Sequence, residues 1–266
     1  MRKSKLLKIK LQSSKALSIL ILLVIALSAC SPAPPLAPPA PTQAALVVAL
    51  PPALRPLGPV LQRCAQTDPG LALFLIEVPE ADLLKTGDLA FSLGLPDPAP
   101  GFASLLTEEA LVPVVNPANP VFRLSMGEIR ALYTGQAVQW SEVGGADENV
   151  AVWVYPQAQA LQTALEDSYL EGRSASSQAW LAPDPTAMRE AISEDPFALG
   201  ALPSAWLTKD VRTVQLDGSL PASARLPVLA IAPAKPQGHT RDLLLCLQSK
   251  PGQTWLESVF PGPPSE

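Results

Sequence analysis

Few residues of this sequence have the types and the spacing that catalysis or metal binding needs. His239 is the only histidine, so a two-histidine metal site is excluded and a hydrolytic triad would depend on this residue alone. No Gly-x-Ser-x-Gly motif accompanies it, and we expect His239 to lie exposed near the start of a helix that begins at about Thr240. Acidic neighbours such as Glu108 and Glu109 point apart, so we expect solvated surface charges there. The sequence therefore predicts no catalytic residue, no metal site and no cofactor, and we expect a protein that is not an enzyme.

The first 29 residues have the charge and hydropathy pattern of a signal peptide. They contain six basic residues and no acidic one, and they include an apolar run from Ala16 to Leu27. This run is too short to span a bilayer comfortably and is followed by small residues. The string Leu27-Ser28-Ala29-Cys30 resembles a lipobox, in which the cysteine is acylated and becomes the N-terminus after cleavage. We expect a bacterial lipoprotein, anchored to the cell membrane through Cys30 and facing the extracytoplasmic side. An uncleaved N-terminal anchor is the alternative and leaves the folded part on the same side.

A tether and a folded part follow the signal peptide. Residues 30–43 are rich in Pro and Ala, a composition that favours extended conformations and cannot bury a core. Without the signal peptide, 13 basic residues stand against 24 acidic ones, a net charge near −11 with no basic cluster, so nucleic acid is not an expected partner. The remaining 220 or so residues suffice for one large α/β unit or two small lobes.

Two cysteines remain once Cys30 is assigned to the lipid. Cys64 shares helical spacing with apolar residues, and Cys246 lies inside the apolar run Leu243–Leu247, so we expect both to be buried. An oxidising compartment permits a disulfide between them. Nothing in the sequence shows that they meet, so two unpaired core thiols are the favoured interpretation and the disulfide is the alternative.

Strand and helix signals alternate in the first half of the folded part. Apolar runs of strand length occur at 46–50, 71–78 and 88–93, and helical patterns lie between them at about 56–66 and 79–85. The run at 71–78 is apolar apart from Glu77 and predicts a buried strand. A β-α-β-α-β order predicts a parallel sheet with helices on its faces.

Helix-capping signals mark the second half of the chain. Ser125 and Glu128 predict a capping box that opens a helix ended by Gly135, and Asp184 precedes Pro185 as an N-cap precedes the first helical residue. Further strands are expected at 110–116, 150–155, 197–202, 211–216 and 226–231, and further helices at 157–171, 240–248 and after Ser249.

Several local strings, taken with this order of elements, resemble a known family. They are Pro113–Pro120, the Ser125–Gly135 helix, Trp140–Gly145, Phe197–Pro203 and Leu244–Gln253. Together they resemble the phosphate-binding proteins of bacterial ABC importers, which have the type 2 periplasmic binding protein fold. The resemblance covers the chain beyond the tether and is weak before Leu106.

The resemblance implies an α/β fold of two lobes, with parallel-type sheets, helices on both faces and two crossing hinge segments. Lobe 1 would contain residues 44–114 and 203–266, and lobe 2 residues 115–202. The crossings would lie near Val112–Asn116 and Leu199–Pro203. A small molecule would bind between the lobes, and an ABC permease would be the partner.

The loops that would hold an oxyanion depart from the family pattern. In the family a Gly/Ser/Thr loop follows the first strand, whereas here two prolines follow it and remove two amide donors. In the loop after the expected strand at 150–155, residues 155–160 contain no Ser, Thr, glycine or arginine. Tight phosphate binding is therefore not expected. The side chains that remain suit a neutral or partly organic ligand; they are Leu54, Ser92, Leu93, Asn116, Tyr155, Gln157 and Gln159. Solvated surface is the alternative interpretation of Gln157 and Gln159.

These observations lead to two hypotheses about function. The first is an extracytoplasmic, membrane-anchored solute-binding protein of an ABC importer. The second keeps the fold without transport and is a degenerate binding domain, acting as a sensor or as a structural, protein-interacting lipoprotein.

Overall fold

The computed structural model describes residues 43–262, so the expected signal peptide, Cys30 and nearly all of the tether lie outside the described residues. The strands are β1 (Ala44–Leu50), β2 (Leu71–Glu77), β3 (Leu89–Leu93), β4 (Phe102–Val115), β5 (Arg123–Leu124), β6 (Ala151–Val154), β7 (Trp180–Leu181), β8 (Ala198–Pro203), β9 (Arg212–Thr213), β10 (Gln215–Leu216) and β11 (Arg225–Ala232). The α-helices are α2 (Gly58–Ala65), α3 (Leu83–Thr86), α4 (Met126–Thr134), α5 (Ala160–Tyr169), α6 (Pro185–Glu194), α7 (Gly238–Gln248) and α8 (Lys250–Val259). Short 3-10 turns are η1 (Pro52–Leu57), η2 (Glu80–Asp82), η3 (Trp140–Val143), η4 (Ser204–Trp206) and η5 (Ala222–Ala224). None of the helices within 43–262 has the length and apolar character needed to cross a bilayer.

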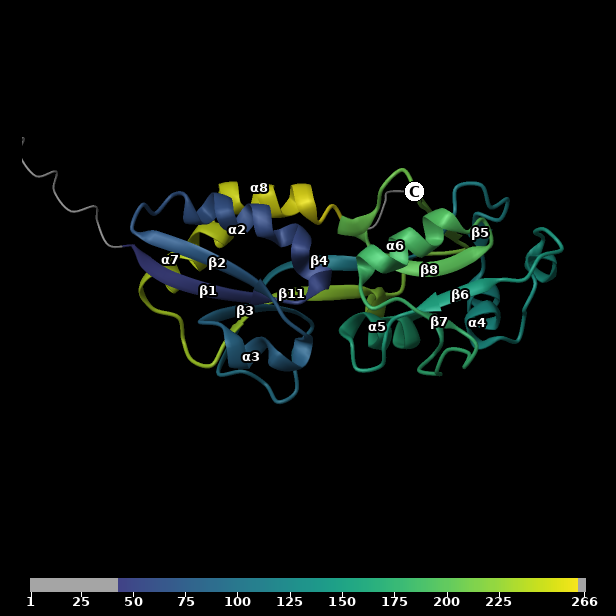
Figure 1. Ribbon diagram of the computed structural model, residues 1–266, viewed down its shortest axis with the longest axis horizontal. Helices are drawn as coiled ribbons and strands as arrows, with labels where there is room; N and C mark the ends of the chain where they lie inside the picture. Colours follow the sequence, from purple (N-terminus) through teal and green to yellow (C-terminus); the bar gives the residue numbers. More distant parts are fainter. Residues whose placement is uncertain (1–42, 263–266) are drawn as a thin grey trace, which may run out of the picture. The chain divides into compact units, whose positions relative to one another are not determined.

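The main sheet has the strand order β2-β1-β3-β11-β4-β8-β6-β7, with β9 paired to β4 (Figure 1). β1 pairs in parallel with both β2 and β3, as the β-α-β-α-β pattern predicts. β11 and β4 run antiparallel to their neighbours, while β8, β6 and β7 are parallel again. Helices α2 and α8 lie on one face of the first strands and α3 on the other (Figure 1). This is the expected α/β architecture with helices on both faces.

The longest strand, β4, joins the two halves of the sheet. Its first part pairs with β11, and its last five residues pair with β8, from Leu111 opposite Pro203 to Val115 opposite Leu199. The two segments expected to cross between lobes therefore lie side by side. The sequence predicts only residues 110–116 of this strand, because polar residues at 107–109 interrupt the apolar run and pairing with distant β11 extends it.

The predicted helix caps at α4 and α6 are confirmed. Ser125 and Glu128 form both halves of the capping box, and Gly135 ends α4 with a left-handed φ of 75°. The Asp184 carboxylate accepts hydrogen bonds from the amides of Thr186 and Ala187. In contrast, α5 begins three residues later than expected, because Ala158 adopts a φ of 70° that a right-handed helix cannot contain.

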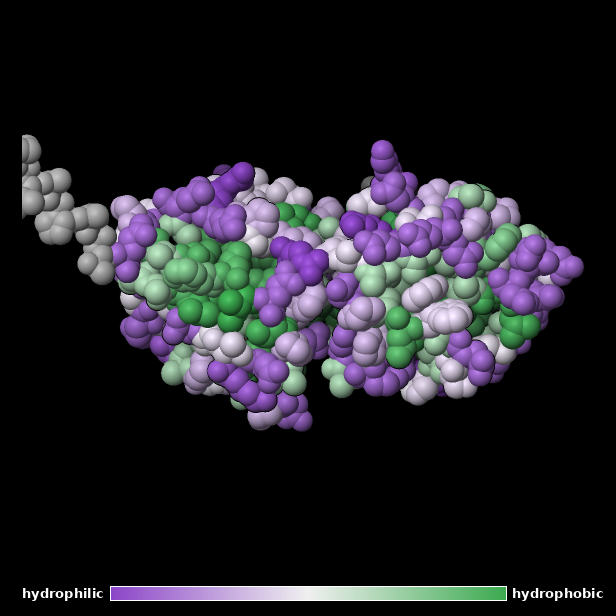
Figure 2. Space-filling model, viewed as in Figure 1, coloured by the Kyte–Doolittle hydropathy of each residue, from purple (hydrophilic) through white to green (hydrophobic). Residues whose placement is uncertain are grey.

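The expectation of a buried strand at 71–78 is wrong. β2 forms the edge of the sheet, and most of its side chains are only partly covered, with Phe74 53% exposed. Figure 2 shows a patch of hydrophobic residues over this strand. The apolar run correctly indicates a strand. It does not indicate whether the strand has a neighbour on both sides or, as here, on one side only.

Cys64 and Cys246 form a disulfide that joins α2 to α7, with 5.7 Å between their Cα atoms. The favoured expectation of two unpaired thiols is therefore wrong, and the alternative is what the structure shows. Cys64 is buried as expected, whereas Cys246 is only half-buried. Their 182-residue separation explains why the sequence did not reveal the pair.

Candidate functional site

Three of the expected ligand-binding residues lie in the core. Leu54 is completely buried in η1, and Ser92 and Leu93 are 3% and 5% exposed at the end of β3. The Ser92 hydroxyl donates a hydrogen bond to the carbonyl of Gly94. Leu54 lies in the turn after β1, and Ser92 and Leu93 are the last two residues of β3. In the structure these three side chains point into packed protein.

Asn116 and Tyr155 are likewise committed to the fold. The Asn116 amide donates to the carbonyls of Ile192 and Ser193, and its oxygen accepts from the amide of Ala118. The Tyr155 hydroxyl donates to the Ala201 carbonyl on β8, and burial raises the pKa of Tyr155 well above its usual value. In this structure Asn116 therefore connects β4 to α6, and Tyr155 connects the end of β6 to β8.

Gln157 is exposed and Gln159 is half-buried at the start of α5. Gln157 donates to the carboxylate of Glu166, and Gln159 donates to the carbonyl of Pro183. Gln159 occupies the N-cap position of α5, yet its side chain does not cap the helix. The start of α5 therefore needs another hydrogen-bond acceptor.

Glu80 supplies that acceptor from a distant part of the chain. It lies in η2, just after β2, and its carboxylate accepts a 2.8 Å hydrogen bond from the Ala160 amide at the start of α5. The side chain is half-buried, and this burial raises the pKa of Glu80 above its ordinary value. The contact joins segments 80 residues apart and lies between the lobes as we expect them.

Arg55 makes a second connection between the same two parts of the chain. Its guanidinium donates two hydrogen bonds, of 2.6 and 2.7 Å, to the carboxylate of Glu77, and a third to the Thr186 hydroxyl in α6. It also lies 5.5 Å from the ring centroid of Trp206. The hydrogen bonds with Glu77 raise the pKa of Arg55. This arginine is thus already neutralised by a carboxylate of its own chain.

The contacts of Arg55, Glu77 and Glu80 were not predicted from the sequence. No local motif contains them, because each contact joins segments far apart in the sequence. One signal was available at the start of α5: the N-cap residue is glutamine, and the first turn has no acidic side chain. A helix that lacks a local cap indicates that a distant group completes it.

The prediction from the sequence that Glu109 is a solvated surface charge is wrong. This residue is 1% exposed on β4, and its Oε1 accepts hydrogen bonds from the Ser204 hydroxyl and the amides of Ala110 and Ala205. Its Oε2 is buried without a hydrogen-bond partner in the described part of the chain. Burial outweighs these hydrogen bonds and raises the pKa of Glu109 to about 7.

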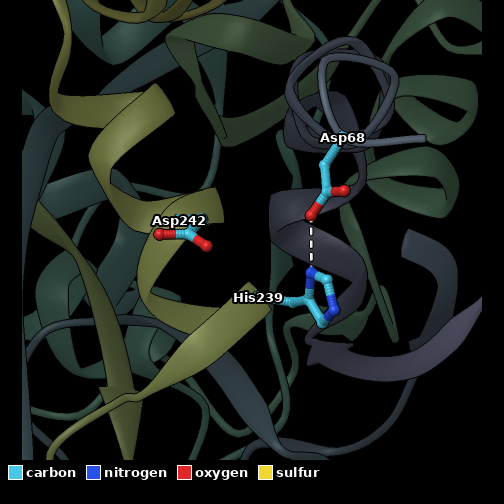
Figure 3. A group of neighbouring side chains, drawn as sticks. All are labelled: Asp68, His239 and Asp242. Carbon is cyan, nitrogen blue, oxygen red and sulfur yellow. Dashed lines mark hydrogen bonds and ion pairs between the residues drawn. The ribbon is translucent and has the colours of Figure 1, made fainter. Parts of the chain in front are cut away.

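The only histidine lies in a small group of potential metal ligands. Asp68, His239 and Asp242 each place one ligand atom within 4.8 Å of the others. Figure 3 shows that the His239 ring faces Asp68, with 2.5 Å between Nδ1 and Oδ2, while Asp242 lies apart. This hydrogen bond lowers the pKa of Asp68. His239 is half-buried, not exposed as expected, and it links the turn after α2 to the first turn of α7, the same two helices that the disulfide joins.

The known proteins that resemble this chain share its fold but are distant from it in sequence. No family model matches the chain. A curated relative, the phosphate-binding protein PstS of Bacillus subtilis (strain 168), is 24% identical over 135 residues. That match spans 48% of this chain and 45% of the relative, so the chain matches slightly less than half of the relative's length.

Two solved structures cover most of the chain. An ABC-type phosphate transport receptor from Vibrio cholerae superposes with a TM-score of 0.64 at 18% identity, over 80% of this chain and 98% of the receptor. A putative phosphate ABC transporter substrate-binding protein from Clostridium perfringens, with bound phosphate, gives a TM-score of 0.71 at 14% identity, over 82% and 98% of the two chains. This chain therefore has the two-lobed periplasmic binding protein fold, of the type found in phosphate-binding proteins.

Proposed function

We propose that this protein is an extracytoplasmic solute-binding protein of an ABC importer, anchored to the cell membrane by lipid on Cys30. The observation that supports the proposal most strongly is the two-lobed fold, which it shares with transport receptors over nearly their whole length. The partner is an ABC permease, and the acidic mature chain is not suited to nucleic acid.

In this proposal the lobes are residues 44–114 with 203–266, and residues 115–202. The paired segments of β4 and β8 connect them, near Val112–Asn116 and Leu199–Pro203. Two adjacent strands can bend together, so the lobes close on a small molecule by a hinge motion without covalent chemistry. No catalytic residue takes part.

The ligand in this proposal is not tightly bound phosphate, although phosphate is bound in the Clostridium structure. The loops after β1 and β6 lack the expected hydroxyl and glycine residues. Arg55, a cation close to both lobes, is paired with Glu77, and the first amide of α5 is bound by Glu80. A neutral or partly organic solute fits these surroundings better than a free oxyanion.

A second function is favoured by a separate observation. Asn116, Tyr155 and Ser92 use their polar groups inside the fold, and the edge strand β2 exposes apolar side chains. Exposed apolar patches often mark surfaces for protein contacts. The alternative is therefore a non-transport sensor or a structural, protein-interacting lipoprotein that has kept the fold.

A thermal-shift screen of the full-length chain in a mild detergent separates the two functions. The panel contains phosphate, other oxyanions, sugars, amino acids and nucleosides. A solute-binding protein gains stability as RT ln(1 + [L]/Kd), about 2.7 kcal/mol at 100 times Kd. We expect a dose-dependent shift with one class other than phosphate. Indifference to every class would replace this proposal by the protein-interacting alternative, and a strong phosphate response would show that the missing loop residues matter less than we infer.

A further inference from the structure

The end of β2 and the turn that follows it carry two carboxylates, Glu77 and Glu80, and each accepts hydrogen bonds from a group of positive character. Glu77 accepts two hydrogen bonds from the guanidinium of Arg55. Three residues later, Glu80 accepts the amide hydrogen of Ala160 at the N-terminus of α5. The two groups best suited to attract an anion in this region are therefore both occupied by the protein itself.

A negatively charged group would stabilise the N-terminus of α5, which has no such group of its own. The helix is ten residues long, its N-cap side chain makes no capping bond, and its first turn contains no acid. The aligned peptide dipoles place partial positive charge at this end, and the first amides have no partner within the helix. Glu80 meets both needs from 80 residues away.

The position of Glu80 is not that of an ordinary surface acid. Its side chain is half-buried, and withdrawing a carboxylate from water is costly unless a specific partner repays it. The Ala160 amide is the hydrogen-bond partner of this carboxylate within residues 43–262. An anionic solute at this position would find the Ala160 amide already hydrogen-bonded and would be repelled by the negative charge of Glu80. Repulsion between like charges is one way in which a protein rejects an unwanted ligand.

We propose that Glu80 determines solute specificity, because its carboxylate takes the place of an anion at the N-terminus of α5 and so excludes oxyanions. The inference rests on the proposed function, since it concerns which solutes reach the region between the lobes. It also explains why a chain with the fold of phosphate-binding proteins can dispense with hydroxyl and glycine residues in the loop before α5. The internal carboxylate has replaced the ligand that such residues would bind.

The test measures the thermal unfolding midpoint of the full-length chain while inorganic phosphate is titrated at constant ionic strength. Wild type is compared with Glu80→Ala, which vacates the position, and with Glu80→Gln, which keeps an acceptor oxygen but removes the charge. The control is Glu257→Ala, which makes the same change in net charge at an exposed position on α8. We expect phosphate to stabilise Glu80→Ala with a half-saturating concentration at least about tenfold below that of wild type. The Gln variant should lie between them, and the control should match wild type.

Equal phosphate responses in all four proteins would overturn the inference, as would a gain in the Glu257 control as large as that in Glu80→Ala. If Glu80→Ala does not fold, the Gln variant decides, because it preserves the volume and one hydrogen bond; a folded Gln variant without any gain overturns the inference. Failure of the proposed function gives a different result. In that case wild type ignores every solute of the panel, whatever the Glu80 variants do with phosphate.

Discussion

Replacing Glu109 by glutamine should remove a pH-dependent loss of stability. Burial raises the pKa of this carboxyl from 4.5 to about 7 in the folded chain. Between these values the folded state binds more protons than the unfolded state, so the free energy of unfolding falls as the pH rises. The difference of about 2.5 pKa units corresponds to about 3 kcal/mol, lost between about pH 4.5 and pH 8. Glutamine imitates the protonated carboxyl and keeps the oxygen that accepts from Ser204, so the variant should not lose this stability.

Urea unfolding of wild type and Glu109→Gln at about pH 4.5 and about pH 8 measures this effect. The two proteins should have similar stability at the lower pH, and the variant should be more stable by about 3 kcal/mol at the higher pH. Glu108→Gln is the matched control, because the neighbouring side chain is exposed and should leave the pH dependence unchanged. Parallel pH profiles for wild type and Glu109→Gln would refute the reasoning.

Three further changes test a disulfide, a helix cap and a close contact between a helix and a strand. Reducing the disulfide, or replacing Cys246 by serine, should lower the free energy of unfolding by about 3 to 5 kcal/mol, because the bond closes a very long loop; urea unfolding with and without reductant measures this, and an unchanged midpoint would contradict it. Asp184→Ala should cost about 1 kcal/mol in the same assay by removing the cap of α6, and a neutral result would show that water replaces the cap. Gly200→Ala should cost about 1 to 3 kcal/mol, because a Cβ there would lie 2.5 Å from Met188 Sδ and 3.0 Å from Ile192 Cδ1; a stable variant would show that α6 can shift away from β8.

Features that depend on adjacent residues were predicted well from the sequence. The cap of α4 by Ser125 and Glu128 and the cap of α6 by Asp184 need only a few residues, and both are present. The parallel arrangement of β1, β2 and β3 also follows from a local order of strands and helices. These predictions succeed because short segments contain all the groups involved.

Features that depend on distant partners were not predictable in the same way. The first part of β4 is a strand because β11 pairs with it, and Glu109 is buried because Ser204 and its neighbours cover it. The disulfide of Cys64 needs a residue 182 positions away. No local pattern contains this information, so the sequence alone favoured two unpaired thiols and placed Glu109 on the surface.

The candidate site shows the same division. The loops that the resemblance assigns to oxyanion binding lack Ser, Thr and Gly, and the sequence predicted ligand contacts from the residues left there, among them Leu54 and Tyr155. Packing against distant strands buries both. The carboxylate of Glu80, which binds the start of α5, comes from a segment that the same reasoning treated only as a short helix.

The proposal of solute binding is tested most directly by tryptophan fluorescence of the full-length chain, titrated with each solute class. Trp206 contacts Arg55 and donates to the Ala53 carbonyl, close to the Arg55 contact with Thr186, so closure of the lobes should change its emission. We predict a saturable change with one solute class in wild type and its loss in Trp206→Phe, which keeps an aromatic ring. Unchanged wild-type emission with every class would contradict solute binding and favour a protein-interacting role.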